Sequence, residues 1–346
     1  TASNMMTQQA LFGITGAWGK LGDDPASELH RRYIDENPNP IGEKFKLESA
    51  KKDNYDRAHR QGHATFLKHK QAQGYYDIFL IDAEGNVVYT VMKETDFGTN
   101  LITGPYKDTG LAKVFQKAIQ SDDPEVFANS DFETYAPSAG APAAFIAVPI
   151  IMNERKLGVL AYQLPNDQIN AIFSNTRGLG TTGETLMVDN AGLLASDSPR
   201  TSGDDTLKVS IASPLLDATG TMEGYRGMNS YAAVVPLQFG DVSWSVIALI
   251  GEEEVWAELM SAGLKSVGFG VILVLAGSLV GLLFSRSLTR PISELVGSMG
   301  RLADGDTSID LKGLERSDEI GDMVRSVAVF RQAEIDKREL ETESET

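Results

Sequence analysis

The sequence predicts an α+β protein: a helical N-terminal region, two tandem antiparallel-sheet units, an apolar membrane-spanning helix and a two-helix coiled-coil segment. Three observations predict this fold. Short β-branched and aromatic runs flank an Asp-x-x-Gly turn in two places, one long stretch carries no charge, and apolar residues after it recur at spacings of three and four. The 346 residues suffice for two or three domains, and the net charge of −17 argues against nucleic acid as a partner.

The N-terminal region, residues 1–74, is expected to be helical with interruptions. A polar, charged pattern from Lys44 to Gln73 contains no strong turn signal and predicts one long helix. His59 and His63 lie one helical turn apart on it, as two metal ligands do. Arg60 stands where a zinc-protease motif needs glutamate, so a solvated helix face is favoured over a metal site.

The first sheet unit is predicted to span residues 75–175. Its first hairpin reads strand, turn, strand, with Asp82 and Gly85 at the turn. The alternating oxygen side chains here fit a turn better than a calcium loop, because glycine stands fourth and not sixth. The further elements expected are a helix over 111–118, strands over 145–151 and 157–164, and a helix over 167–173.

The second sheet unit, residues 176–262, repeats the first. Aligning Ile78–Thr90 with Thr185–Asp197 places Asp82 on Asp189 and Gly85 on Gly192. The second copy replaces Glu84 and Asn86 with apolar residues, which disfavours a shared metal loop. The second hairpins also match, 147–150 with 234–237 and 157–162 with 244–249, and each copy ends in a helix. We therefore expect two tandem sensor-like units.

Residues 263–286 are predicted to cross a membrane. The uncharged run Ser266–Ser285 has the length that a hydrocarbon core of about 30 Å requires of a helix. Arginines follow the run and glutamates precede it, so residues 1–262 are expected outside and 286–346 in the cytoplasm. Since a translocated N-terminal domain needs an earlier signal, a membrane helix upstream of Thr1 is also expected.

Residues 287–340 show the seams of two coiled-coil helices. Apolar residues recur at spacings of three and four in each helix, and a polar connector, 305–314, joins them. The seam residues are Ile292, Leu295, Met299 and Leu302 in the first helix and Ile320, Met323, Val327 and Phe330 in the second. Because each helix buries its seam only by pairing, a parallel four-helix bundle made by two chains is expected.

These patterns resemble known families. The series Arg290-Pro291-Ile292, then Gly305, then Asp318-Glu319-Ile320-Gly321 is similar to a HAMP linker. The run Tyr75–Leu101, followed by Gly104–Ala112, resembles the double Cache, or tandem PAS-like, sensor domain of bacterial methyl-accepting chemotaxis proteins. The Arg…Trp-Tyr element of amino-acid-binding members is not found between residues 89 and 118.

The resemblance implies a homodimeric chemoreceptor of the bacterial inner membrane, with a periplasmic or extracellular sensor and no cofactor. It implies a small-molecule ligand, a carboxylate or an amine, and cytoplasmic partners such as a CheA/CheW-type kinase and adaptor, besides membrane lipid. The same input region is also compatible with a histidine kinase or a nucleotide cyclase such as a diguanylate cyclase. An anchored ectoenzyme is disfavoured, because no catalytic combination stands out in the sequence.

The resemblance also implies a ligand pocket on the first sheet, under the loop after its second strand. The matching segments supply Tyr89, Lys93, Tyr106, Asp108, Thr109, Asp131 and Tyr135. In this interpretation Lys93 meets a ligand carboxylate, whereas Asp108 or Asp131 holds an amine. The residues implied in signal relay are Pro291, Asp318, Glu319 and Gly321.

Overall fold

The computed structural model describes residues 5–51, 53–211 and 220–344 and confirms the predicted α+β class. The chain divides into two compact units, Thr1–Trp256 and Ala257–Thr346. The first unit contains the N-terminal helices and two antiparallel sheets, and the second contains most of the apolar helix and the two helices after it.

The N-terminal helices are shorter than predicted. They are α1 (Met5–Trp18), α2 (Pro25–His30), the π-helical turn η1 (Arg31–Asp35), the 3-10 turn η2 (Lys44–Lys46) and α3 (Asn54–Gln73). The long helix expected from Lys44 is therefore wrong at its start. Its true N-cap is Asp53, whose carboxylate accepts a hydrogen bond from the Asp56 backbone N–H at 2.9 Å. Gly74 ends the helix in the left-handed conformation, with φ of 73°.

The first sheet unit is built on a five-stranded antiparallel sheet of order β2-β1-β7-β6-β3. Its strands are β1 (Asp77–Asp82), β2 (Val87–Thr90), β3 (Ala128–Asn129), β6 (Phe145–Met152) and β7 (Arg155–Gln163). The unit also contains α4 (Gly110–Gln120), the 3-10 turn η3 (Ala136–Ser138) and the small hairpin β4 (Glu133–Tyr135) and β5 (Ala141–Ala143).

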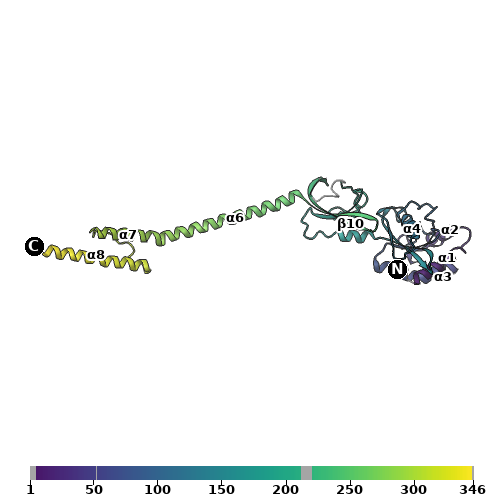
Figure 1. Cartoon of the computed structure of the whole chain (residues 1–346), viewed down its shortest axis with the longest axis horizontal. Coiled ribbons are helices and arrows are strands. Elements are labelled where there is room, and N and C mark those ends of the chain that lie inside the picture. Colours follow the sequence, from purple (N-terminus) through teal and green to yellow (C-terminus); the bar gives the residue numbers. More distant parts are fainter. Residues whose placement is uncertain (1–4, 52, 212–219, 345–346) are drawn as a thin grey trace. The chain divides into compact units, whose positions relative to one another are not determined.

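Two hydrophobic cores cover the two faces of this sheet. Side chains alternate along β1, so Ile78 and Leu80 pack with α1 and α3, which lie side by side in Figure 1. Phe79 and Ile81 point the other way and pack with α4 and the β4–β5 hairpin. Asp77 shares the alternation of Phe79 and Ile81, and it is fully buried. A carboxylate therefore opens the strand on the α4 face, where the strand's other two side chains are apolar.

The first hairpin turn has the geometry that the sequence predicted. The Asp82 carboxylate accepts hydrogen bonds from the backbone N–H and the side-chain amide of Asn86, both at 2.8 Å, and Gly85 has a φ of 89°. The second copy repeats the arrangement, because Asp189 accepts from the backbone of Leu193 and Gly192 has a φ of 86°. The oxygens at this tip serve the turn.

The second sheet unit is built on a four-stranded antiparallel sheet of order β8-β11-β10-β9. Its elements are α5 (Asn166–Phe173), β8 (Glu184–Asp189), β9 (Gly220–Tyr225), β10 (Met228–Phe239) and β11 (Val242–Gly251). Leu186 and Val188 of β8 face a core with Met222 and Ile247. The faces correspond to those of the first sheet, because α5 precedes β8 as α3 precedes β1 and packs on the opposite face.

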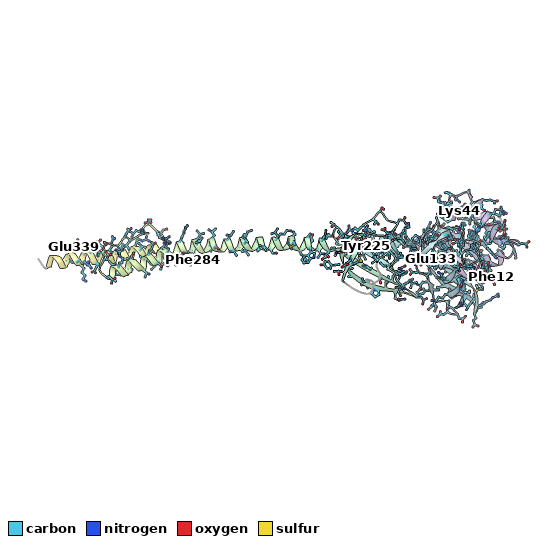
Figure 2. The ribbon with its side chains drawn as sticks, turned by 90° about the horizontal axis from the view of Figure 1, so that it is seen from above. Phe12, Lys44, Glu133, Tyr225, Phe284 and Glu339 are labelled. Carbon is cyan, nitrogen blue, oxygen red and sulfur yellow. The ribbon has the colours of Figure 1, made fainter. Side chains whose placement is uncertain are left out.

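The strand β11 continues directly into α6 (Glu252–Phe284), which enters the second compact unit. Among the residues described, α6 contains the stretch long and apolar enough to cross a membrane, with a mean hydropathy of 2.5. Its side chains project outward along the helix up to Phe284 without protein contacts that bury them (Figure 2). It is followed by the π-helical turn η5 (Ser285–Thr289), α7 (Arg290–Ala303) and α8 (Glu319–Ser344).

His59 and His63 are fully buried, so the expected solvated helix face is wrong. Their rings stack at 4.8 Å between α3 and the sheet. His63 Nε2 lies 2.6 Å from the Phe45 carbonyl oxygen and Nδ1 lies 2.7 Å from the Tyr89 hydroxyl, which fits a neutral ring. Burial, and then the charge of Lys93, lowers the pKa of His63 to about 4.

We predict that His63 makes the first unit less stable as the pH falls from 6.5 to 4. The unfolded chain binds a proton on this ring below pH 6.5 and the folded chain does not, so up to about 1.4 kcal/mol per pH unit is lost. His63→Gln keeps a hydrogen-bond donor and an acceptor but cannot titrate. The variant should therefore take up one proton fewer on unfolding, which weakens the pH dependence of the unfolding free energy. Urea unfolding of the full chain in detergent, monitored by circular dichroism at several pH values, measures the difference.

The matched control is His69→Gln, on the same helix but only partly buried, which should change the pH dependence less. Comparing variants with the wild type removes the opposing contribution of other groups that titrate in this range. An H63Q variant with the same pH dependence as the wild type would contradict the prediction.

Candidate functional site

Three carboxylates gather at one end of the first sheet, on the α4 face. We call Asp77, Glu94 and Asp96 the acidic site. Asp77 opens β1 and pairs in register with Gln163, the last residue of β7. Glu94 and Asp96 lie in the loop that follows β2. Asp77 and Asp96 are fully buried, and Gln163 is 2% exposed. The strand ends and one loop thus place acidic groups where apolar side chains would ordinarily lie.

Asp77 is held by backbone and hydroxyl donors. Its Oδ1 accepts hydrogen bonds from the backbone N–H groups of Val91 at 2.9 Å and Met92 at 3.0 Å, and its Oδ2 accepts from the Thr90 hydroxyl. These bonds fix the loop after β2 to the start of β1. Burial nevertheless raises the pKa of Asp77 to about 7, because the donors compensate only part of the lost hydration.

Glu94 and Asp96 accept hydrogen bonds from hydroxyl groups. The Tyr76 hydroxyl donates to one oxygen of Glu94 at 2.6 Å, and the Ser138 hydroxyl donates to the other at 2.7 Å. The Tyr135 hydroxyl donates to Asp96 Oδ2 at 2.7 Å. Burial, and then the charge of Asp77, raises the pKa of Asp96 well above its usual range. The three carboxylates therefore disfavour one another's ionisation.

Two buried acceptor atoms in this region have no donor. These are Asp96 Oδ1 and Gln163 Oε1, and the amide of Gln163 is tied to the same network because its Nε2 donates to the Ser138 hydroxyl at 3.2 Å. Within the described part of the chain, none of the three carboxylates forms an ion pair. Buried polar atoms are ordinarily paired, so these two acceptors lack a hydrogen-bond donor and the three carboxylates lack an ion-pair partner among the described residues.

The predicted pocket residues separate into three groups in the structure. Tyr135 reaches the acidic site, and the Tyr106 hydroxyl lies 2.8 Å from the Thr95 hydroxyl in the same loop. Thr109 caps α4 by accepting from the Ala112 backbone N–H, while Asp108 is exposed. Of these four residues, only Tyr135 contacts a buried carboxylate.

Tyr89 and Lys93 lie on the opposite, helical side. The Tyr89 hydroxyl meets His63, and the Lys93 ammonium lies 5.8 Å from the centre of the Tyr33 ring. Lys93 is fully buried and donates to the Val91 carbonyl at 3.2 Å, with a left-handed φ of 60°. Burial lowers the pKa of Lys93 to about 7. The charge of Asp77 opposes this lowering of the Lys93 pKa.

Asp131 joins the first sheet unit to the second. Its carboxylate accepts a hydrogen bond from the Trp244 indole N–H at 2.7 Å. Two residues earlier, the Asn129 amide donates to the Phe239 carbonyl at 2.7 Å and accepts from the Asp241 backbone N–H at 3.1 Å. The segment before Tyr135 thus binds the β10–β11 hairpin at two points.

Sequence reasoning missed Asp77, Glu94, Asp96 and Gln163. One signal was available: Asp77 opens an apolar strand on the same face as Phe79, where a charged residue costs most. Glu94 and Asp96 gave no such signal, because a loop after a strand ordinarily places acidic side chains in water.

The predicted relay residues occupy defined places in α7, α8 and their connector. Pro291 lies in the first turn of α7. Asp318 accepts from the Gly321 backbone N–H at 3.0 Å and forms a bidentate ion pair with Arg316, whose hydrogen bonds lower the pKa of Asp318 to about 2. Glu319 is exposed. A methyl group on Gly321 would lie 2.1 Å from the Arg316 carbonyl oxygen, so this position requires glycine.

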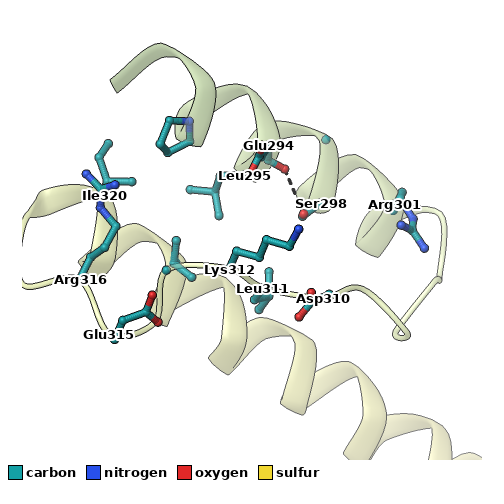
Figure 3. A pocket seen from close by; sticks show the side chains of 14 residues that line it. Glu294, Leu295, Ser298, Arg301, Asp310, Leu311, Lys312, Glu315, Arg316 and Ile320 are labelled. Atoms are coloured by element: carbon teal, nitrogen blue, oxygen red, sulfur yellow. Dashed lines mark hydrogen bonds between the residues drawn. The ribbon is translucent and has the colours of Figure 1, made fainter. Parts of the chain in front are cut away.

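The predicted seams are only half buried within one chain. Leu295, Leu302 and Val327 are buried together with Ile309 and Leu311, which the connector contributes. Four other seam residues stay partly exposed, each over 38% to 63% of its surface: Ile292, Met299, Met323 and Phe330. A groove of 580 Å³ lies between α7, the connector and α8, with Glu294, Ser298 and Lys312 among the side chains that line it (Figure 3).

Two protein families match this chain. The Cache domain matches residues 43–259, and the HAMP domain matches residues 283–336. A probable chemoreceptor, y4sI of Sinorhizobium fredii, is 29% identical over 260 residues, which cover 75% of this chain and 33% of that protein. The chain thus spans a third of the length of the curated relative it matches.

Solved structures similar to this chain include two sensor domains. The ligand-binding domain of the Pseudomonas aeruginosa amino acid chemoreceptor PctB, in complex with L-Arg, is 13% identical, with a TM-score of 0.42 and coverage of 74% of this chain and 94% of that one. The sensor domain of the V. cholerae histidine kinase DctB is 13% identical, with a TM-score of 0.38 and coverage of 70% and 97%.

We predict that Asp96→Asn stabilises the ligand-free protein at pH 8, because burial raises the pKa of Asp96. A raised pKa means that the folded state holds a proton that the unfolded state releases, so the wild type loses stability as the pH rises. Asparagine cannot ionise and still accepts the Tyr135 hydrogen bond, so the gap between variant and wild type should grow with pH. Urea unfolding between pH 5 and 8 measures it.

Asp197→Asn is a control of opposite sign. Asp197 accepts hydrogen bonds from the backbone N–H groups of Asp205 and Thr206, both at 2.9 Å. Burial raises the pKa of Asp197, but the hydrogen bonds outweigh it and the net pKa is lowered. D197N should therefore destabilise the protein at pH 8. The interpretation of the acidic site fails if D96N also destabilises it there.

We predict that Gly321→Ala disrupts the start of α8. The added methyl group overlaps the Arg316 carbonyl, and overpacking of this kind costs about 1–3 kcal/mol. Gly297→Ala in α7 is the matched control, because its methyl group meets no atom within 4 Å. Hydrogen exchange of residues 305–330 in the full chain should accelerate in G321A and not in G297A. Equal exchange in both variants would contradict the prediction.

Proposed function

Because the chain belongs to the Cache domain family and carries a HAMP domain, we propose that it is a membrane chemoreceptor sensing a small molecule outside the cell membrane. Binding at the first sheet unit would change the contacts that this unit makes with the second, and α6 would carry the change to the HAMP domain. The named relative, a probable chemoreceptor, supports this assignment. We propose no catalytic step in these segments.

The observation that carries the ligand assignment is the pair of unpartnered acceptors in the acidic site, Asp96 Oδ1 and Gln163 Oε1. We propose that they receive the ammonium group of the ligand. A primary ammonium has three hydrogen-bond donors, which can pair the two acceptors. It also has a positive charge, which can compensate the three carboxylates. A ligand whose charge is only a carboxylate would instead add to the repulsion.

The second step is the relay out of the sheet units. We propose that β11 carries it, because Trp244 near its start is held by Asp131 and its last residue leads into α6. At the other end, the Glu254 carboxylate in the first turn of α6 accepts from the backbone N–H groups of Thr181 and Thr182, at 2.7 and 2.8 Å. A shift of β11 would therefore move an anchored helix.

We propose that α6 crosses the bacterial inner membrane with the sheet units outside. Three glutamates form its first turn, whereas Arg286 and Arg290 follow its apolar part, as the positive-inside rule requires. The half-exposed seam and the groove between α7 and α8 fit a second copy of this chain, so we propose a homodimer. A CheA/CheW-type kinase and adaptor would receive the signal in the cytoplasm.

We predict that ammonium compounds stabilise the full chain against heat and that simple carboxylates do not. The probes are ethylamine, putrescine, acetate and succinate, added to the protein in nanodiscs. A compound present at 100 times its Kd stabilises the folded state by about 2.7 kcal/mol, which a thermal-shift assay detects. Binding should tighten from pH 6 to pH 8, because an ammonium prefers ionised Asp77, whose pKa is about 7.

The variants separate a specific site from general charge effects. Asp96→Asn should abolish the shift, while Asp108→Asn, which alters an exposed carboxylate, should retain it. Stabilisation by succinate or acetate alone, or an ammonium shift that survives D96N, would overturn the assignment.

A further inference from the structure

The repeat places two buried acids at equivalent positions. Extending the match of Ile78–Thr90 with Thr185–Asp197 by one residue puts Asp77 on Glu184. Each acid opens the first strand of its sheet, is fully buried and faces the core away from the preceding helix. Each also accepts a hydrogen bond from a hydroxyl, of Thr90 in the first unit and of Ser198 in the second. The two sites thus have one construction.

They differ in what compensates the charge. Glu184 has a cation of its own, because Arg226 Nη1 lies 3.3 Å from Glu184 Oε1 and donates to the Ser198 hydroxyl at 3.2 Å. The guanidinium carbon also lies 5.9 Å from the centre of the Tyr225 ring, and only 25% of the side chain is exposed. Among the ion pairs of the described residues, Asp77 has no corresponding partner.

Arg226 reaches this position from a strained turn. It lies between β9 and β10 with a φ of 53°, and the next residue, Gly227, also has a positive φ. A non-glycine residue in this conformation costs on the order of 1 kcal/mol. This two-residue hairpin turn places both central residues at positive φ, and it brings the Arg226 side chain to the buried carboxylate.

We propose that Arg226 is an internal ligand of the second sheet unit. It occupies the cation position that the first unit, in the function proposed above, leaves for an ammonium compound. Its removal would open a site for a small guanidinium or ammonium ion beside Glu184. The second unit is thereby closed to external cations, which confines sensing to the first unit. Removing the partner of a buried carboxylate leaves an uncompensated charge, which strongly destabilises the fold. A small cation that compensates this charge would therefore bind at the vacated position.

The test is chemical rescue of Arg226→Ala in the full chain, held in nanodiscs. Loss of the partner should accelerate hydrogen exchange in β8 and β11 by roughly 100-fold or more. Methylguanidinium chloride should restore protection with a saturable dependence, whereas sodium chloride at equal ionic strength should not. No acceleration in R226A, or equal restoration by sodium chloride, would overturn the proposal.

Two controls assign the rescue to the carboxylate. Arg200→Ala removes an arginine of the same unit that donates to the backbone carbonyls of Gly180 and Gly183, so methylguanidinium should not rescue it through Glu184. The double variant E184Q/R226A removes the buried charge and should lose less protection and ignore the probe. Rescue that persists in either control would contradict an internal ligand.

If R226A alone does not fold, the double variant still decides the matter. Folding of E184Q/R226A would support charge compensation, while failure of both would show that Arg226 acts only by packing and would overturn the proposal. The outcome is independent of the first unit, because repeating the rescue in an Asp96→Asn background should give the same result. Failure here and failure of the ammonium site are therefore distinguishable.

Discussion

Burial of a carboxylate at the start of a strand is the constraint around which both sheet units are built. An isolated ionised carboxylate cannot remain in an apolar core without a partner, so it is neutralised or bound by a cation. The second unit meets the requirement with Arg226, and the first meets it with a raised pKa at Asp77. One fold, duplicated, thus shows both responses, and in the function proposed above the ligand binds to the unit whose buried acid has no ion-pair partner.

The position of the acidic site also determines which contacts connect it to the second sheet unit. Tyr135 donates to Asp96, and the segment leading to it is bonded through Asp131 and Asn129 to the β10–β11 hairpin. The strand β11 then continues into α6. A continuous series of contacts is a condition for coupling and is not itself coupling, which requires that two arrangements of these contacts exist. Among the predicted pocket residues, Tyr135 is the one that both contacts the acidic site and belongs to the segment bonded to the β10–β11 hairpin.

Local rules in the sequence predicted the elements, and long-range contacts determined the site. The Asp-x-x-Gly turns, the repeat and the apolar helix each follow from short patterns, and the structure contains them. The start of α3 was placed too early, because the cap of Asp53 is a single side-chain hydrogen bond within a polar stretch. The sequence predicts a solvated face for His59 and His63, because their partners, Glu48, Phe45 and Tyr89, are brought to them by tertiary packing alone. Asp96 met Tyr135, 39 residues away, for the same reason.

The pKa of Asp77 determines how the buried charge of the first unit is compensated when no ligand is bound. With a pKa of about 7, a proton compensates the buried charge in much of the population, and an ammonium group would take the place of that proton. A protonated carboxyl supplies one donor, whereas an ammonium group supplies three, and Gln163 Oε1 has no donor in the ligand-free unit. In the function proposed above, an ammonium group that pairs these acceptors would supply free energy for moving Tyr135 and the segment attached to it.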